Sequence, residues 1–223
     1  MGVNIEAYQT IISELNQKNT QLIAVSKTKP IEDIEALYNL GQKDFGENYV
    51  QELVDKQAIL PKDIRWHFIG HLQSNKVKYI APFVHLIHGV DSLKLLQEIN
   101  KQGIKNNRTI SCLLQMHIAK EETKFGLDEN ELEQVIAQVE NLPNVQVSGL
   151  MGMASFTNDT SIVQNEFKHL HALFLKYQSL NEQTPNWNIL SMGMSGDYPL
   201  AIDCGSNMVR IGSLLFGARN YTT

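Results

Sequence analysis

The hydrophobic positions of this chain fall into short apolar runs that alternate with amphipathic segments. The runs are too short for helices, and several end in glycine or a polar residue, as strands buried on both faces of a parallel sheet do. The pattern predicts eight strands, at Leu22–Ser26, Asp44–Gly46, Trp66–Gly70, Leu86–Val90, Cys112–Ile118, Val147–Met151, Ile189–Gly193 and Val209–Gly212.

The intervening segments carry apolar residues three or four positions apart, the spacing of one helix face. Three of these faces consist of Ile31, Ile34, Leu37 and Tyr38; of Leu132, Val135, Ile136 and Val139; and of Phe167, Leu170, Leu173, Phe174 and Tyr177. A further amphipathic helix before the first strand is predicted from Ile5, Tyr8, Ile11, Ile12 and Leu15. We expect Pro30 in the first turn of its helix, and Asp91, Asp128 and Asp159 at N-cap or first-turn positions.

Eight strands that alternate with helical connections predict an α/β fold, a single (β/α)8 TIM barrel with an additional N-terminal helix. No linker-like stretch, charge block or low-complexity tract divides the sequence, so residues 1–223 are expected to form one domain. An open, doubly wound sheet is the alternative, because one strand more or fewer changes whether the sheet closes.

Composition narrows the classes of partner. The chain is 43% hydrophobic and 19% charged, as globular proteins are, and its formal charge of −5 argues against nucleic acid or an anionic membrane as the main partner. There is no apolar run of about 20 residues and no signal-peptide pattern. Cys112 and Cys204 lack the spacing of a disulfide framework, so we expect reduced thiols and a cytoplasmic location. Nothing specifies an interface, and we expect a monomer.

Two segments near the C-terminus predict a phosphate site. Ser191–Asp197 and Met208–Ser213 each run from an apolar strand into glycine and hydroxyl residues and then into a helical pattern. Such turns leave backbone N–H groups unpaired and directed at one spot, which suits a phosphate. In barrel enzymes the loops after the last two strands commonly hold this group.

Lys27 is the candidate for covalent chemistry. It ends the first predicted strand, at the rim where barrel active sites lie, and alternation places it on one face with Ile23 and Val25. Desolvation on an apolar wall lowers the pKa of a lysine and makes its amine available to a carbonyl. Lys29, two residues on, is expected to be the solvated lysine. The alternative for Lys27 is a solvated lysine at a strand end.

An amine and a phosphate site in one barrel mouth indicate pyridoxal phosphate (PLP), held as a Schiff base on Lys27. Arg210 then lies where its guanidinium can donate to the pyridine nitrogen and leave that nitrogen unprotonated. An ion pair between Arg210 and a carboxylate such as Glu47 is the alternative.

Several motifs, in order, carry a resemblance to a known family. The chain resembles the pyridoxal phosphate homeostasis proteins, which share the barrel fold of the alanine racemase N-terminal domain. The resemblance extends from Leu22 to Ala218. It rests on the two C-terminal turns and on the motifs at Ala24–Pro30, Phe45–Glu52, Trp66–Gly70, Leu72–Lys76 and Gly149–Met151.

The resemblance assigns roles to seven residues. Lys27 would bear the cofactor, Arg210 would face the pyridine nitrogen, and Asn48 would lie beside the ring or its 3′-oxygen. The phosphate would be held by Ser195 and Ser213 with the backbone amides of Gly196 and Gly212.

Four further residues bear on the site. Asp197, a carboxylate beside a phosphate, is expected to cap its helix and point away. Lys124 matches a family lysine near the barrel mouth and is a candidate second, transient aldehyde acceptor. His67 and His71 have the i, i+4 spacing of zinc ligands on a helix but straddle a strand end, so no metal is expected.

Three functions compete. The protein binds and buffers PLP without efficient catalysis of its own, racemises an amino acid, or acts as a Schiff-base aldolase on a sugar phosphate. Racemisation needs a base on each face of the α-carbon, and the alanine racemases take the second from a domain that would follow the barrel here, where this chain ends at Thr223. Arg210 and the family resemblance disfavour the aldolase. The carrier is therefore expected, with PLP-dependent apo-enzymes as candidate recipients.

Overall fold

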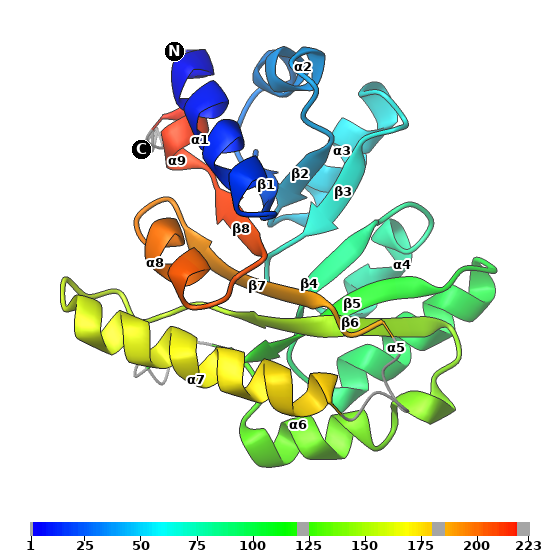
Figure 1. Ribbon diagram of the computed structural model, residues 1–223. Coiled ribbons are helices and arrows are strands. Elements are labelled where there is room, and N and C mark those ends of the chain that lie inside the picture. The colour runs from blue at the N-terminus through cyan, green and yellow to red at the C-terminus, as the bar shows by residue number, and fades with distance from the viewer. Residues whose placement is uncertain (1, 120–124, 180–185, 218–223) are drawn as a thin grey trace.

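The strands of this computed structural model close into a barrel, and the structure describes residues 2–119, 125–179 and 186–217 (Figure 1). All eight strands are parallel and pair in chain order, with β8 returning to β1. They are β1 (Gln21–Val25), β2 (Asp44–Glu47), β3 (Arg65–Phe68), β4 (Leu86–Val90), β5 (Ile110–Met116), β6 (Val145–Gly152), β7 (Ile189–Met194) and β8 (Met208–Ile211). The predicted barrel is confirmed, and the open sheet is excluded.

Helices surround the barrel and connect successive strands. The longer helices are α1 (Ile5–Gln17), α2 (Ile31–Asn39), α3 (Val50–Ile59), α5 (Leu93–Lys105), α6 (Glu129–Ile136) and α7 (Thr160–Gln178). The shorter ones are α4 (Val77–Ile80), α8 (Tyr198–Asp203), α9 (Ser213–Phe216) and the 3₁₀ turns Ser74–Lys76 and Val139–Asn141. The additional helix α1 lies beside α9 and strand β1 (Figure 1).

Side chains alternate between two buried regions, because successive residues of a strand point to opposite sides of the sheet. One large cluster joins the outward side chains of the strands to the apolar faces of the helices. A separate small cluster fills the inside of the barrel, with Ile23, Leu86, Leu113, Met151 and Met208. Ile23 thus points inward from β1, which places Val25 and Lys27 on the same side, as alternation predicts.

Helix starts follow local capping chemistry, with one exception among the three predicted aspartates. Asp128 caps α6 through a capping box, and Asp159 caps α7 by accepting the N–H of Ser161. The expectation for Asp91 is wrong. Ser92 caps α5, and the Asp91 carboxylate instead lies 3.1 Å from His71 Nδ1. Pro30 lies at the N-cap of α2, one position before its first turn.

Gly149 shows how closely two of the strands approach. It has a φ of +144°, and a Cβ there would lie 1.8 Å from the carbonyl oxygen of Ile189 on β7. Any side chain at this position would push β6 and β7 apart, so the pairing of these two strands requires glycine here.

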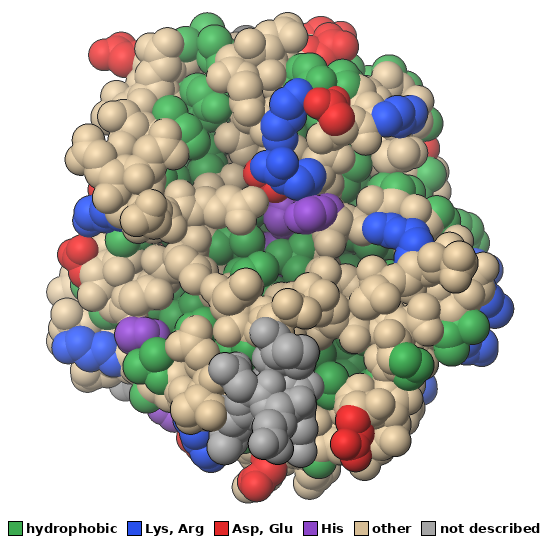
Figure 2. All heavy atoms as spheres, turned by 45° about the vertical axis from the view of Figure 1, so that its right-hand side comes forward, with side chains coloured by type: hydrophobic (Ala, Val, Ile, Leu, Met, Phe, Trp, Pro, Cys, Tyr) green, Lys and Arg blue, Asp and Glu red, His purple; other side chains and the backbone are tan. Residues whose placement is uncertain are grey.

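The surface has no dominant sign of charge on the face that Figure 2 shows. Basic and acidic side chains are scattered there among neutral ones, in keeping with the small net charge of −5. None of the helices in the described part of the chain is long and apolar enough to cross a membrane.

Candidate functional site

A pocket of about 450 Å³ opens at the carboxyl ends of the strands. The ends of β1, β2, β7 and β8 supply most of its wall, and β1, β8 and β7 are neighbours in the barrel (Figure 1). All seven residues singled out from the sequence line it, namely Lys27, Asn48, Ser195, Gly196, Arg210, Gly212 and Ser213. The fold therefore brings together residues from opposite ends of the chain.

Charged side chains of α3 hold the loop that carries Lys27 in place. Lys27 is half-buried and directly precedes Thr28, which has a left-handed φ of +61°. The Thr28 N–H donates to Glu52 Oε1 at 2.6 Å, and Lys56 Nζ donates to the carbonyl of Ser26 at 2.8 Å. These contacts with α3 hold a backbone conformation that a β-branched residue rarely adopts.

The expectation that Lys29 is solvated is wrong. Its Nζ donates to the carbonyl oxygen of Phe216 at 2.7 Å, and the side chain is only partly exposed. It lines the same pocket as Lys27 and ties the loop after β1 to the turn after β8. Sequence spacing could not show this contact, because it depends on closure of the barrel between the first and last strands.

Arg210 is buried on β8 and makes no ion pair within the described residues. Its Nη1 donates to the carbonyl oxygen and to Oγ of Ser191 at 2.9 and 2.7 Å, and its Nη2 donates to the carbonyl of Gly152 at 3.1 Å. Burial lowers the pKa of Arg210 to about 10, so the guanidinium stays charged at neutral pH. The ion pair with Glu47 does not form, since Glu47 pairs with Lys56 at 2.8 Å.

The two C-terminal turns meet at Ser195 and Gly212. The Gly212 N–H donates to Ser195 Oγ at 3.2 Å, so a hydroxyl occupies the place where an anion would bind this amide. A Cβ at Gly212 would lie 3.2 Å from Val25, whereas at Gly196 the space is open. The pocket wall at these turns is therefore mainly backbone and hydroxyl.

Asp197 takes the N-cap position of α8, but its carboxylate does not cap that helix. Its Oδ1 accepts the N–H of Met194 at 2.6 Å instead, within the turn after β7. The expectation of a capping contact is therefore wrong. Asp197 is not among the pocket's lining residues.

Asn48 supplies a polar atom that lacks a partner. Its Oδ1 is buried and has no hydrogen-bond partner among the described residues, and the residue lines the pocket directly after β2. An unpartnered buried oxygen costs free energy unless a ligand donates to it. With the Lys27 amine, the Arg210 guanidinium and two hydroxyls, this set suits a ligand that has a carbonyl, a ring acceptor, a hydroxyl and an anionic group.

Glu47 lies just outside this wall, fully buried at the end of β2. Its Oε1 accepts from Ser26 Oγ at 2.6 Å and from Lys56 Nζ at 2.8 Å, while Oε2 has no hydrogen-bond partner in the part of the chain that the structure describes. Burial raises the pKa of Glu47 to about 7, against the lowering effect of Lys56. It supports the loop that carries Lys27 rather than facing the pocket.

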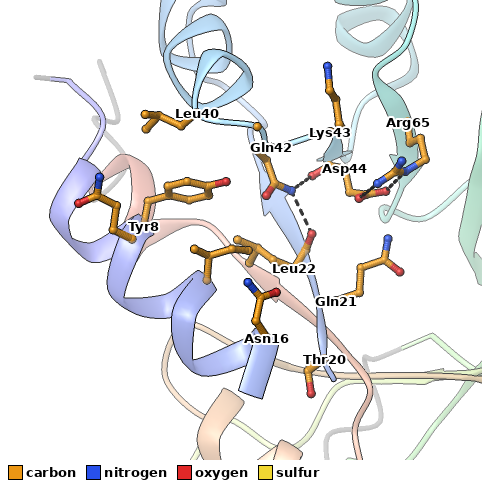
Figure 3. Close-up of a pocket in the computed structure, with 13 residues that line it drawn as sticks. Tyr8, Asn16, Thr20, Gln21, Leu22, Leu40, Gln42, Lys43, Asp44 and Arg65 are labelled. Atoms are coloured by element: carbon orange, nitrogen blue, oxygen red, sulfur yellow. Dashed lines mark hydrogen bonds and ion pairs between the residues drawn. The ribbon is translucent and has the colours of Figure 1, made fainter. Parts of the chain in front are cut away.

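A second pocket, of about 470 Å³, lies at the opposite end of the barrel, between α1 and the starts of β1 and β2 (Figure 3). Its charged side chains and Gln42 already have partners. Gln42 Nε2 donates to the carbonyls of Leu22 and Asp44, Arg65 binds Asp44, and Lys43 binds Asp63 at 2.7 Å. To bind these charged groups, a ligand would have to displace the contacts that they already make.

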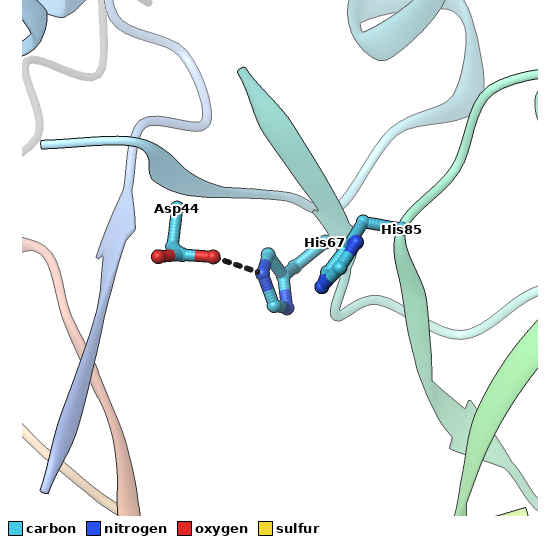
Figure 4. Close-up of side chains that lie close together, drawn as sticks. All are labelled: Asp44, His67 and His85. Atoms are coloured by element: carbon cyan, nitrogen blue, oxygen red, sulfur yellow. Dashed lines mark hydrogen bonds and ion pairs between the residues drawn. The ribbon is translucent and has the colours of Figure 1, made fainter. Parts of the chain in front are cut away.

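Three potential metal ligands converge near the same end, with Asp44, His67 and His85 offering atoms within 4.8 Å of one another (Figure 4). However, Arg65 binds both oxygens of Asp44, and His67 Nε2 is hydrogen-bonded to Asp44 at 3.0 Å. A cation would have to displace or oppose the guanidinium, so this group is better explained as a hydrogen-bond network. His67 and His71 do not share a site, because His71 stacks on Phe125 at the rim, with ring centroids 4.0 Å apart.

Comparison with known proteins identifies the family. Residues 3–220 match the family model described as alanine racemase, N-terminal domain. The pyridoxal phosphate homeostasis protein of Haemophilus influenzae is 42% identical over 213 residues, which cover 93% of this chain and 89% of that protein. The chain belongs to the pyridoxal phosphate homeostasis protein family.

Solved structures of this family have the same architecture. PipY of Synechococcus elongatus without PLP superimposes with a TM-score of 0.90 at 36% identity, covering 95% of this chain and 99% of that one. The structure of PipY with PLP bound gives a TM-score of 0.87 at the same identity and coverage. The similarity spans the whole barrel.

Proposed function

We propose that this protein binds PLP as a Schiff base on Lys27 and takes part in PLP homeostasis, without efficient catalysis of its own. The observation that carries the proposal is the meeting of seven residues, far apart in sequence, around one pocket at the carboxyl ends of the strands. The names of the relatives and the PLP-bound PipY structure support the same ligand.

Each part of the pocket has a role in this proposal. When bound, PLP supplies an aldehyde that condenses with an amine and releases one water. Lys27 provides that amine, on a loop that Glu52 and Lys56 hold in place. Arg210 donates toward the ring nitrogen and, always protonated, keeps that nitrogen an acceptor.

The phosphate and the ring hydroxyl are the remaining points of attachment. Ser195 and Ser213, with the amides of Gly196 and Gly212, bind the phosphate, and Gly212 exchanges its bond to Ser195 Oγ for the anion. The 3′-oxygen side of the ring meets Asn48, whose Oδ1 then gains a partner.

The pocket argues for a carrier over a racemase. Among the described residues, no tyrosine, histidine or carboxylate lines it. Racemisation requires proton transfer on both faces of the α-carbon, and Lys27 serves one face only. The aldolase alternative gives Arg210 no ring nitrogen to face, because a sugar phosphate has none.

The remaining parts of the proposal concern the protein's setting. We propose that residues 1–223 form one domain that is monomeric, resides in the cytoplasm and hands PLP to apo-enzymes. Both cysteines, Cys112 and Cys204, are free and buried, in keeping with a reducing compartment. Lys124, the candidate second aldehyde acceptor, lies outside the described residues.

The test is to load the protein with PLP, reduce it with borohydride and map the modified peptide by mass spectrometry. The expected adduct is on Lys27, and Lys27→Ala should lose both the adduct and the Schiff-base absorbance. Lys43→Ala, at the second pocket, is the matched control and should keep both. An adduct on another lysine, or none with the wild type, would overturn the proposal.

A further inference from the structure

Inside the barrel, a chain of hydrogen bonds between side chains leads from Arg210, at the carboxyl ends of the strands, to the amino ends of the strands. Arg210 Nη1 bonds Ser191 Oγ at 2.7 Å, and Ser191 Oγ lies 3.2 Å from His88 Nδ1. His88 Nε2 lies 3.0 Å from His67 Nδ1, and His67 Nε2 lies 3.0 Å from Asp44 Oδ1. All five side chains are buried, and the chain of hydrogen bonds ends at the Asp44–Arg65 pair near the second pocket (Figure 3).

The residues at the two ends fix the donor-to-acceptor direction of every hydrogen bond in this chain. Arg210 can only donate, and the ionised Asp44 can only accept. His67 therefore donates from Nε2 to Asp44, which leaves its Nδ1 to accept from His88 Nε2. His88 Nδ1 in turn accepts the Ser191 hydroxyl proton, and Ser191 Oγ accepts from Arg210. Every bond is satisfied with both histidines neutral, and burial, which lowers the pKa of each, favours that state.

A uniform direction has an electrostatic consequence. Ser191, His88 and His67 all present a lone pair toward Arg210 and a proton toward Asp44. Their dipoles thus stabilise a buried cation at one end and a buried anion at the other, and neighbouring bonds in such a chain polarise one another. This matters because Arg210 has no carboxylate partner among the described residues.

The same contacts orient the guanidinium. Three of its five N–H groups are used, two on Nη1 by Ser191 and one on Nη2 by Gly152. Nε–H and the second N–H of Nη2 are left for a ligand in the pocket that Arg210 lines. Without His88, the Ser191 hydroxyl is free to rotate and no longer keeps its lone pair on Arg210.

We propose that Ser191, His88 and His67 are positioning residues that hold the Arg210 guanidinium toward the ring nitrogen of bound PLP, with Asp44 as the remote end of the chain. This rests on the proposed function. It assigns a binding role to polar residues in the interior of the barrel that do not touch the pocket. It also gives a role to two histidines and a serine that are buried inside the barrel, beside its aliphatic and methionine side chains.

The test compares two ligands, PLP and the analogue in which the ring nitrogen is replaced by C–H. Ser191→Ala and His88→Leu should each weaken PLP binding about tenfold, the loss expected of a charge-assisted hydrogen bond. Both variants should bind the analogue within about twofold of the wild type, because it offers Arg210 no acceptor. Affinities come from titration of the Schiff-base absorbance.

Two further variants make the result specific. In His88→Gln the amide has both a donor and an acceptor and should restore most of the PLP affinity. Met208→Leu alters packing inside the barrel without touching the chain of hydrogen bonds, and should leave the preference for PLP over the analogue unchanged. Thermal unfolding of each apo-protein identifies any variant that does not fold. If His88→Leu does not fold, the comparison of the two ligands rests on Ser191→Ala.

The outcomes separate this inference from the proposed function. Equal losses for both ligands, or no loss for either, would overturn the positioning role while the Lys27 adduct remains. Failure of the wild type to bind PLP would overturn the proposed function itself.

Discussion

Strand β2 is only four residues long, yet it places a buried carboxylate at each end, and the two behave in opposite ways. Burial alone would raise the pKa of Asp44, but hydrogen bonds from Arg65 and His67 outweigh it and hold that pKa well below its usual range. At Glu47, burial prevails over Lys56 and raises the pKa to about 7. The difference lies in how completely each carboxylate is bonded.

The contrast extends to the two ends of the barrel. At the amino ends of the strands, the charged groups of the pocket already bind partners. At the carboxyl ends, Asn48 Oδ1 is buried in the pocket wall with no hydrogen-bond partner among the described residues, and Arg210 has no counter-ion among them. Two pockets of similar volume thus differ in unsatisfied polarity, and we place the ligand where that polarity remains.

The largest effect is expected from Asp44→Asn. This change removes a buried anion from Arg65 and His67 and should lower the free energy of unfolding by about 4 kcal/mol at pH 7. Because the folded-state pKa is depressed, the stabilisation is fully present above the unfolded pKa of 3.8 and is lost as pH falls below it. Urea unfolding at pH 7 and pH 3 measures this. Asp63→Asn, which removes an exposed carboxylate, is the control and should cost far less.

Glu47→Gln should show the opposite dependence on pH. The folded carboxyl keeps its proton up to about pH 7, whereas the unfolded one loses it near 4.5, so this group makes the wild type less stable as pH rises through that window. Relative to Glu47→Gln, the wild type should lose about 3 kcal/mol between these limits. Unfolding curves of both proteins at several pH values give the difference. A constant difference would show that Glu47 is ionised throughout.

The smallest effect concerns the phosphate. Ser195→Ala removes a hydroxyl from the turn after β7 and should weaken PLP binding about tenfold. Pyridoxal, which lacks the phosphate, should bind the variant and the wild type equally. Gln21→Ala at the second pocket is the control and should change neither affinity. Loss of pyridoxal binding as well would mean that Ser195 shapes the pocket and does not contact the phosphate.

Much of the fold follows from local pattern. All eight strands lie within two residues of their predicted limits, since short apolar runs bounded by polar residues describe buried parallel strands well. The seven site residues follow strand ends, or lie on β8, and the barrel topology gathers them at one rim. Their arrangement could be predicted because the fold alone determines which strand ends are neighbours.

What the sequence did not reveal depends on contacts across the barrel. His67, His88 and Ser191 come from β3, β4 and β7, and no spacing in the chain shows that their side chains meet. The available signal was a polar residue inside each of three apolar strands. The Lys29 contact also requires closure of the barrel, because Phe216 follows the last strand. The Asp197 contact is local: the carboxylate accepts from Met194, three residues earlier in the turn after β7, and so does not cap its helix.

The pairing of β1 with β8 has a consequence for how the protein is made. Lys27 is translated long before Arg210 and Ser213. A nascent chain that lacks its last strand displays the reactive amine but has neither the guanidinium nor the final turn. Under the proposed function, PLP is held firmly only after β8 has been translated and has paired with β1, so bound ligand reports a closed barrel.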